Sequence, residues 1–321
     1  MNAQLFLSIA LATYNGERYI GEQLDSIASQ TRLPDELVIS DDASVDATPA
    51  IVLDFARRAP FPVRFQTNSE RLGSTRNFEL AIRACDGDII FLCDQDDVWY
   101  PDKIALIEER FMNDPGVGAV FTDADVVDQD LHPSGLRLWN AVRFGSQEQA
   151  RVADHDAFPL LLKQFVVTGA TMAFRSTYRE LVLPIPGIWV HDAWIALLIS
   201  ATSHLAALPE PLIAYRQHGA NQIGLPRPGK NRSKTRAAIY EPRLLRHEAA
   251  KTRLLGFADR LPDGKRKIRL LDDKLVFLRA CAGLPDARWR RLPAALRELV
   301  TLRYHRYAKG GIWTFRRDLL H

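Results

Sequence analysis

The sequence predicts an α/β fold: a mostly parallel sheet flanked by helices, followed by a basic, α-helical C-terminal extension. Over about the first 120 residues, short apolar runs of strand length alternate with patterns typical of amphipathic helices. Such alternation is characteristic of parallel sheets that helices cover on both faces. The expected strands are Leu5–Thr13, Leu37–Ser40, Val63–Gln66, Ile89–Cys93 and Val117–Phe121.

Three helices are expected between these strands. The run 20–27 carries isoleucine and leucine at i, i+4 and i+7, the spacing of one helix face. Thr48 is a suitable N-cap, and Pro49 behind it fits the first helical position. Pro101 opens a further segment with apolar residues at helical spacing. Each helix can therefore return the chain for the next parallel strand.

The pattern changes after about residue 150, where longer apolar segments follow one another. We expect these segments to complete the sheet. They are a helix over His155–Gln164, a strand over Phe165–Phe174, a helix from His191 and a strand over Leu212–Tyr215.

The distribution of charge predicts two domains, residues 1–225 and residues 226–321. The net charge is only +3, yet residues 226–321 hold 25 Lys and Arg against 9 Asp and Glu, and the preceding residues hold 17 against 30. The proline-containing, basic segment Leu225–Lys234 is the expected linker. Basic amphipathic helices are expected beyond it, over Arg243–Leu261, Lys265–Ala282 and Leu292–Lys309.

Composition excludes several classes of protein. With 47% hydrophobic and 25% charged residues over 321 positions, the chain is folded and not disordered. Its three cysteines form no C-x-x-C pair, which argues against a disulfide framework or a zinc knuckle. No apolar run approaches the length of about 18 residues that spans a membrane, and the N-terminus lacks the pattern of a signal peptide. We therefore expect a cytoplasmic protein, with peripheral binding to the inner face of the plasma membrane as a further expectation.

Acidic residues stand where two of the expected strands end. Asp41 and Asp42 follow the second strand, and the run Asp94–Asp97 follows the fourth. In parallel sheets, ligands bind beyond the carboxyl ends of the strands. Three carboxylates within four positions repel one another unless a cation compensates them, and oxygen ligands favour Mg²⁺ or Mn²⁺ bound to a substrate diphosphate. The alternative is a solvated acidic turn before the helix at Pro101.

Polar residues after the first and third strands extend this predicted site. Thr13, Tyr14 and Asn15 offer hydrogen-bonding groups suited to a base and a ribose. Asn68 and Arg76 follow the third strand, where an arginine could reach a phosphate. Asp41 and Asp42 alone would also suit an ordinary turn.

Three motifs resemble those of family 2 glycosyltransferases: Ala12–Gly16, Ser40–Thr48 and Cys93–Trp99. The resemblance covers about residues 5–225, and bacterial rhamnosyltransferases are similar members. It implies a GT-A fold and an inverting, metal-dependent transfer of a sugar, with L-rhamnose the first expectation, from a dTDP-, UDP- or GDP-sugar. The implied acceptor is a glycan or a lipid-linked glycan, in the synthesis of a bacterial surface polysaccharide such as O-antigen, capsule or exopolysaccharide.

The resemblance also implies roles for single residues. Asp41 and Asp42 would contact the nucleobase and ribose, and Asp94 with Asp96 would form the D-x-D pair. Asp96 is the first expected ligand of Mn²⁺ or Mg²⁺, Asp94 the second, and His218 could complete the coordination, although it could equally be a solvated loop residue. The full set of expected donor-binding residues is Thr13, Tyr14, Asn15, Asp41, Asp42, Asn68, Arg76, Asp94 and Gln95.

The general base that the family requires is expected at Asp192. The family has Glu-Asp at the start of a helix here, whereas this chain has His191-Asp192. One carboxylate facing the anomeric carbon can accept the hydroxyl proton as the new bond forms. The alternative role of Asp192 is to cap the helix. Gly169, His191 and Trp194 are expected on the acceptor side.

Two other functions remain open from the residues alone. A metal-dependent nucleotidyltransferase or phosphohydrolase also places carboxylates after parallel strands, although no P-loop or dinucleotide motif is present. A non-enzymatic scaffold would use only the basic C-terminal region. That region could lie on an anionic membrane surface or pack against the acidic body of the protein. Nucleic acid is not an expected partner, because no recognition motif accompanies the charge.

Overall fold

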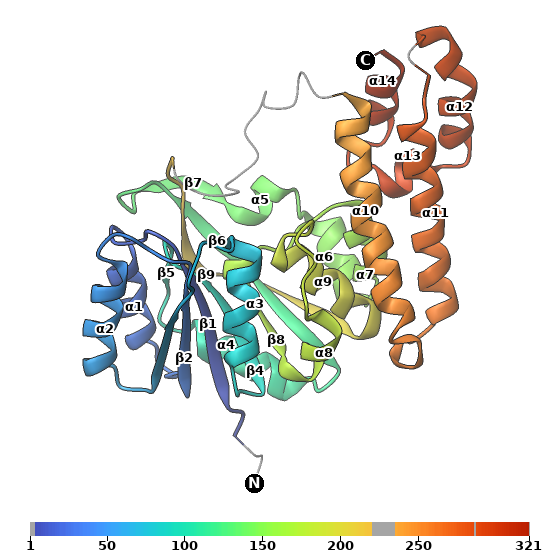
Figure 1. Cartoon of the computed structure of the whole chain (residues 1–321). Helices are drawn as coiled ribbons and strands as arrows, with labels where there is room; N and C mark the ends of the chain where they lie inside the picture. The colour runs from blue at the N-terminus through green and yellow to red at the C-terminus, as the bar shows by residue number, and fades with distance from the viewer. Residues whose placement is uncertain (1–3, 220–234, 286, 321) are drawn as a thin grey trace. The chain divides into compact units, whose positions relative to one another are not determined.

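The computed structural model describes residues 4–219, 235–285 and 287–320, and it contains two compact units (Figure 1). The first unit comprises residues 4–155, 166–199 and 203–219. The second comprises residues 156–165, 200–202 and the described residues after the gap. The expected linker Leu225–Lys234 lies outside the described residues, so the domain boundary at residue 225 stays a prediction.

A nine-stranded sheet forms the first unit, in the order β3-β2-β1-β4-β8-β6-β9-β5, with β7 paired to β6. The first four strands of this order are parallel, as the alternation of strands and helices predicts. Their bounds are β1 (Leu7–Thr13), β2 (Glu36–Asp41), β3 (Val63–Thr67) and β4 (Ile89–Asp94). The predicted α/β fold class is confirmed.

The other half of the sheet is mixed. Strand β8 runs antiparallel to both β4 and β6, while β9 runs parallel to β6 and antiparallel to β5. Strands β8 and β9 come from the region after residue 150, where the regular strand–helix alternation has ended, whereas β5, β6 and β7 precede it. The strands are β5 (Val98–Trp99), β6 (Val117–Val127), β7 (Pro133–Arg137), β8 (Met172–Arg175) and β9 (His204–Arg216).

Helices flank the sheet (Figure 1). The three expected first helices are present, and Ser74–Ala84 forms a fourth that the sequence analysis missed. Helix α2 begins at Thr48 itself with Ala47 at the N-cap, so Thr48 does not cap the helix. Its hydroxyl instead accepts a hydrogen bond from the Gly16 backbone N–H (2.7 Å). The helices are α1 (Ile20–Ala28), α2 (Thr48–Arg58), α3 (Ser74–Ala84), α4 (Lys103–Asn113), α5 (Leu138–Val142), α6 (Ser146–Ala153), α8 (Arg179–Val182) and α9 (His191–Thr202).

The strand expected over Phe165–Phe174 is wrong for most of its length. Residues 164–168 have no regular structure, Gly169–Thr171 form a 3₁₀ turn, and only β8 is extended. The Gly169 backbone N–H donates to the Asp192 side chain (3.0 Å) and not to a neighbouring strand. A side-chain contact from α9 has therefore replaced the sheet pairing that the apolar composition suggested.

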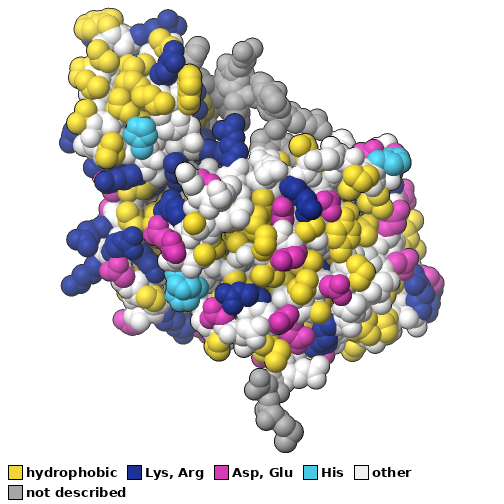
Figure 2. All heavy atoms as spheres, turned by 180° about the vertical axis from the view of Figure 1, so that it is seen from behind, with side chains coloured by type: hydrophobic (Ala, Val, Ile, Leu, Met, Phe, Trp, Pro, Cys, Tyr) yellow, Lys and Arg dark blue, Asp and Glu magenta, His cyan; other side chains and the backbone are white. Residues whose placement is uncertain are grey.

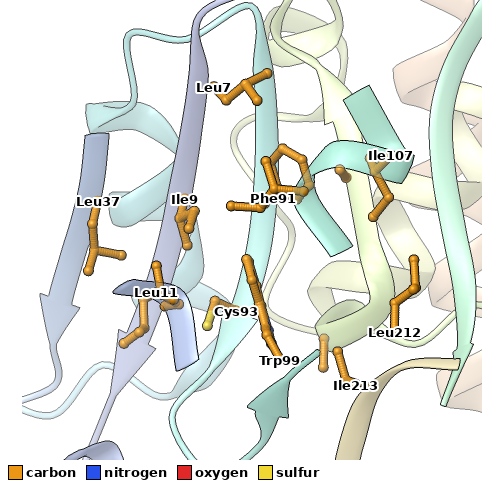
Figure 3. Packing of buried hydrophobic residues seen from close by; sticks show 14 of the residues in the cluster. Leu7, Ile9, Leu11, Leu37, Phe91, Cys93, Trp99, Ile107, Leu212 and Ile213 are labelled. Carbon is orange, nitrogen blue, oxygen red and sulfur yellow. The ribbon is translucent and has the colours of Figure 1, made fainter. Parts of the chain in front are cut away.

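A large hydrophobic cluster of the first unit packs on one face of the central strands (Figure 3). Leu7, Ile9 and Leu11 alternate along β1, and all three are buried. Figure 3 shows them beside Phe91 and Cys93 of β4. Because β1 and β4 are buried along most of their length, the loops that follow their carboxyl ends start from fixed positions.

The second unit consists of helices. Helix α11 matches its predicted range to within one residue, and α10 begins and ends earlier than expected. The range Leu292–Lys309 contains two helices, because Leu302 adopts a left-handed backbone conformation (φ 61°) that interrupts it. No helix among the described residues is long and apolar enough to cross a membrane. The helices are α7 (Ala157–Lys163), α10 (Arg236–Leu255), α11 (Gly264–Ala282), α12 (Arg288–Val300), α13 (Arg303–Tyr307) and α14 (Ile312–Leu320).

Candidate active site

The carboxyl ends of β1, β2 and β4 lie at one edge of the sheet. In the strand register, Thr13 is level with Asp41 and Ala12 is level with Asp94. The residues of the three predicted motifs are therefore neighbours in space, although Ala12 and Asp94 are 82 positions apart in the sequence (94 − 12). Parallel pairing produces this convergence, because it aligns the carboxyl ends of successive strands.

Asp41 joins the first two motifs. Its side chain is fully buried and accepts hydrogen bonds from the Thr13 hydroxyl (2.8 Å), the Ser44 hydroxyl (2.6 Å) and the Ser44 N–H (2.9 Å). The Ser44 hydroxyl in turn accepts from the Asn15 N–H (2.8 Å), and the Asn15 side chain accepts from the Val45 N–H (3.0 Å). Thr13, Asn15 and Asp41 thus form one rigid rim.

Asp42 organises the loop that follows β3. Its carboxylate accepts from the backbone N–H groups of Leu72 (2.7 Å) and Gly73 (2.8 Å) and from the Asn68 amide (3.1 Å). Asn68 also donates to the buried Asn77 of α3, whose amide binds the carbonyl oxygens at the ends of β1 and β2. Asn77 was missed because a single amide within a helix gives no signal in one sequence.

Gln95 and an unpredicted arginine hold Tyr14 from two sides. The Gln95 amide accepts from the Tyr14 N–H (2.8 Å) and donates to the Tyr14 carbonyl (3.0 Å). The exposed Arg71 guanidinium lies over the Tyr14 ring, 4.1 Å from its centroid. Arg76, the arginine that the sequence analysis selected for a phosphate, instead pairs with the buried Glu79. Arg71 is therefore the arginine that the structure brings to the rim.

The carboxylates after β4 repel one another in a buried setting. Burial, followed by the nearby Asp96 and Asp192, raises the pKa of Asp94 to about 8. Burial and the same cluster raise the pKa of Asp97 well above its usual range. One Asp97 oxygen accepts from the Arg216 N–H (2.9 Å), and the other has no hydrogen-bond partner in the described part of the chain. The predicted solvated turn is thus incorrect for Asp97, which is buried.

Lys103 lies buried near this cluster without neutralising it fully. Its ammonium donates to the Ala170 carbonyl (2.6 Å) and lies 3.7 Å from the Trp99 ring centroid. Burial lowers the pKa of Lys103 to about 7, although the charges of Asp97 and Asp94 oppose this shift. A lysine at the start of an amphipathic helix gave no sequence signal of this position.

His218 lies beside Asp96, and its role as a metal ligand stays a prediction. Its Nε2 lies 2.7 Å from an Asp96 carboxylate oxygen, and its ring packs on Tyr19. The buried Arg216 holds the same segment by donating to the Asp96 carbonyl (2.7 Å). The potential ligand atoms of Asp94, Asp96 and His218 do not all lie within 4.8 Å of one another. Among the described residues, the one set of three potential ligands that meets this distance is the exposed Asp128, Asp130 and His132.

These side chains fit a divalent cation. Carboxylate oxygens with one imidazole suit Mn²⁺ or Mg²⁺, and the partnerless Asp97 oxygen lies among like charges that a cation would compensate. The geometry supports Asp96 and His218 as direct ligands more strongly than Asp94.

Asp192 is held at the start of α9 by two backbone groups. One carboxylate oxygen accepts from the Gly169 N–H (3.0 Å), and the other accepts from the Ala193 N–H (2.6 Å). The N-cap of α9 is Val190, so the alternative role of Asp192 as the cap is wrong. The charge of Asp192 contributes to the raised pKa of Asp94, so the two carboxyl groups lie near each other.

His191 and Gly169 pack together beside Asp192. A Cβ atom on Gly169 would lie 2.7 Å from His191 Nε2, so no larger residue fits there without movement of the imidazole. The His191 ring is buried against Phe78 (3.9 Å between centroids), and neither of its nitrogens has a hydrogen-bond partner among the described residues. Burial lowers the pKa of His191, which favours the neutral imidazole.

Two aromatic residues change the predicted list. Trp194 is 0% exposed and its indole N–H donates to the Val182 carbonyl (2.7 Å), so its expected place facing the acceptor is wrong, and it packs in the core. Tyr215 lies near the end of β9. Burial and the nearby charges of Asp97, Asp94, Asp96 and Asp192 raise the pKa of Tyr215.

The parallel half of the sheet carries the acidic cluster at its strand ends, and the mixed half lies beside Asp192. This arrangement is that of a GT-A glycosyltransferase. The model of glycosyl transferase family 2 matches residues 8–177. The chain belongs to this family, and the resemblance that its three motifs indicated is confirmed.

Two relatives illustrate the family. The chain is 31% identical over 229 residues to an uncharacterized protein of Mycobacterium tuberculosis, covering 66% of this chain and 59% of that relative. It thus spans little more than half the length of this relative. It is 29% identical over 235 residues to the dTDP-rhamnosyl transferase RfbG of Shigella flexneri, covering 67% of this chain and 73% of RfbG.

Solved structures support the fold. S. aureus TarS in complex with UDP-GlcNAc superposes with a TM-score of 0.57 at 15% identity, covering 93% of this chain and 82% of that chain. The mannosyltransferase PcManGT from Pyrobaculum calidifontis, in complex with GDP-Man and Mn²⁺, superposes with a TM-score of 0.54 at 21% identity, covering 94% and 76%. At these identities the likeness shows the GT-A fold alone.

Proposed function

We propose that this glycosyltransferase moves L-rhamnose from a dTDP-sugar to an acceptor hydroxyl with inversion at the anomeric carbon. The observation that carries the inverting mechanism is the placement of Asp192, a single carboxylate that the Gly169 and Ala193 N–H groups hold at the start of α9. A single carboxylate on the acceptor side suits one direct displacement.

The donor binds, in this proposal, along the rim at the carboxyl edge of β1, β2 and β4. Asp41 and Asp42 hold the loops that meet the nucleobase and ribose, and Tyr14, stacked by Arg71, forms one wall. Asn68 orders the same loop, and Arg76 stands at the start of α3, where its guanidinium is exposed. The dTDP-rhamnose preference is supported by the likeness to RfbG.

Asp96 and His218 would hold Mn²⁺ or Mg²⁺, and Asp94 would complete the site from the ribose side. The 2.7 Å contact between Asp96 and His218 supports this assignment, as does the bound Mn²⁺ of the mannosyltransferase PcManGT. When bound, the cation supplies positive charge to the diphosphate leaving group.

Asp192 acts as the base. The acceptor oxygen forms a bond to the anomeric carbon while the bond from that carbon to the diphosphate oxygen breaks, and the hydroxyl proton passes to Asp192. The N–H groups of Gly169 and Ala193 fix the carboxylate in one orientation. His191, neutral and without a hydrogen-bond partner in the described chain, is available to orient the acceptor.

The acceptor class is a glycan or lipid-linked glycan of a bacterial surface polysaccharide. This class is what the resemblance of the three motifs implies. A lipid-linked acceptor would bring the enzyme to an anionic membrane surface, the partner that the basic C-terminal charge predicts.

The test is the Asp192→Asn variant with dTDP-rhamnose, Mn²⁺ and candidate acceptors. Asparagine keeps the size of the side chain and can accept one of its two backbone hydrogen bonds, but it cannot accept the proton, so transfer should fall by about 10²- to 10⁴-fold with an unchanged donor Kd. Full activity of the variant would remove Asp192 from the mechanism. Release of pyrophosphate or inorganic phosphate in place of a nucleoside diphosphate would instead favour a nucleotidyltransferase or phosphohydrolase.

A further inference from the structure

Helix α12 carries an apolar stripe that the core of the second unit does not cover. Trp289, Leu292, Leu296 and Val300 recur at i, i+3, i+7 and i+11, the spacing of one helix side. Trp289 is 75% exposed and Val300 is 73% exposed. The buried side of the same helix carries other residues, namely Arg291, Ala295 and Glu298.

Helix α14 adds a second apolar stripe. Ile312, Trp313 and Leu320 are exposed, with Trp313 at 68%, while Asp318 faces the core. Helices α12 and α14 pack against each other. Figure 2 shows hydrophobic side chains gathered over the C-terminal helices, with Lys and Arg beside them. The two stripes are called the α12–α14 face from here on.

The charges around the α12–α14 face have one sign. Both acids of the described segment 287–320, Glu298 and Asp318, are buried and accept from Arg303 and from Tyr240, respectively. Every exposed charged side chain of this segment is therefore basic. They are Arg288, Arg290, Arg297, Arg306, Lys309 and Arg316.

The two tryptophans are paired with arginines. The Arg290 guanidinium lies 4.8 Å from the Trp289 ring centroid, and the Arg316 guanidinium lies 5.1 Å from that of Trp313. Tryptophan suits the boundary between water and hydrocarbon, because its ring is apolar and its N–H is polar. An arginine beside it can bury its stem while its charged group reaches a phosphate.

We propose that the α12–α14 face binds the surface of an anionic phospholipid bilayer, with α12 and α14 lying in the plane of the interface. Charge complementarity selects this partner: a second copy docked by the same face would bring two all-basic rims together, whereas anionic headgroups would neutralise them. The apolar stripe between the arginines matches the acyl boundary, which a nucleic acid lacks. The inference extends the proposed transfer by naming the residues that meet the membrane.

The test measures partitioning of the full chain onto vesicles, without any sugar donor. If the chain does not bind vesicles, the proposed sugar transfer still stands. If sugar transfer is not observed, vesicle binding can still be measured. Vesicles of phosphatidylcholine mixed with phosphatidylglycerol should bind at least about tenfold more tightly than phosphatidylcholine alone, and added salt should weaken the binding. Tryptophan fluorescence should shift to the blue and be quenched by lipids brominated in the acyl chain.

Two double variants separate the apolar and charged contributions. Trp289→Ser with Trp313→Ser should lower partitioning by about tenfold or more. Arg290→Gln with Arg297→Gln should remove about tenfold of the preference for anionic vesicles. Leu53→Ser on α2 is the matched control, because Leu53 is a similarly exposed apolar residue on the first unit, and it should bind as the unaltered protein does.

Three outcomes would overturn the inference. In the first, the unaltered chain shows no preference for anionic vesicles, either because it binds both kinds equally or because it binds neither. In the second, both double variants bind as tightly as the unaltered chain. A dimer that Trp289→Ser dissociates, without vesicle binding, would assign the face to a second copy. If circular dichroism shows that the tryptophan variant is unfolded, the test rests on the arginine variant, which replaces the exposed Arg290 and Arg297.

Discussion

Both compact units bury charged side chains, but they surround them differently. The sheet unit places carboxylates next to one another, whereas the helical unit gives Asp318 and Arg291 several hydrogen-bond partners. At the carboxyl edge of the sheet, Asp94 and Asp97 are placed among like charges, and the buried Lys103 has a pKa lowered to about 7. In the helical unit, Asp318 accepts from Tyr240, Tyr304 (3.1 Å) and Arg317 (2.9 Å). Buried Arg291 likewise donates to three backbone carbonyls.

The contrast separates a site from a scaffold. A buried charge that is fully hydrogen-bonded supports the fold, and removing one partner leaves the others unpaired. A buried cluster of like charges is unfavourable by itself and is compensated only when a cation binds. Substitutions in the two regions should therefore affect different properties of the protein.

The largest expected effect concerns Asp94→Asn, which removes a carboxyl group whose ionisation the acidic cluster opposes. Transfer should fall by about 10²-fold or more, while the melting temperature of the metal-free protein should rise at neutral pH, because folding no longer has to force a proton onto this group. Steady-state kinetics and thermal unfolding measured with and without Mn²⁺ check both parts. A variant that is destabilised without metal would break the contrast between the regions.

The converse substitution is Asp318→Ala in the helical unit. It leaves the hydroxyls of Tyr240 and Tyr304 and the Arg317 guanidinium without their shared acceptor, which should lower the free energy of unfolding by roughly 2–3 kcal/mol. The kcat per folded molecule should stay unchanged. Denaturant unfolding measures the first quantity, and a loss of kcat at full folding would contradict the structural role.

Gly169→Ala tests the packing on the acceptor side. The added Cβ would meet His191 Nε2 at 2.7 Å, so the imidazole must move, and kcat/KM for the acceptor should fall about tenfold. Combining it with His191→Ala should relieve the clash, so the double variant should lose less than the two single losses together. Additive losses would show that the contact does not matter.

The smallest expected effect is a pH dependence from Lys274 of α11. Burial, with the nearby Arg243, lowers the pKa of Lys274 to about 7, while its ammonium lies 2.6 Å from the Tyr307 carbonyl. The unfolded chain then binds the proton more tightly, so this group contributes stability that grows as the pH rises from about 7 toward 10. Unfolding at pH 7 and pH 9 should show a smaller rise for Lys274→Met, and equal rises would contradict the lowered pKa.

Much of the donor side could be predicted from local sequence. An apolar run that ends in Asp94-Gln95-Asp96-Asp97 predicts a buried strand whose carboxylates stand at its carboxyl end. Parallel pairing then brings Thr13, Asp41 and Asp94 to one edge without further information. The basic, amphipathic character of α12 was equally visible, since a helix repeats every 3.6 residues.

The tertiary structure decided the arrangement of the acceptor side and the surroundings of several single residues. Lys103 and Tyr215 approach the acidic cluster from α4 and β9, Trp194 turns into the core, and Gly169 bonds to Asp192 in place of a strand. None of these contacts follows from the neighbours of a residue in sequence, because strand register and helix packing over long separations set them. Sequence by itself determined the class of the fold and the type of chemistry, while the three-dimensional packing decided which side chains face the reacting groups.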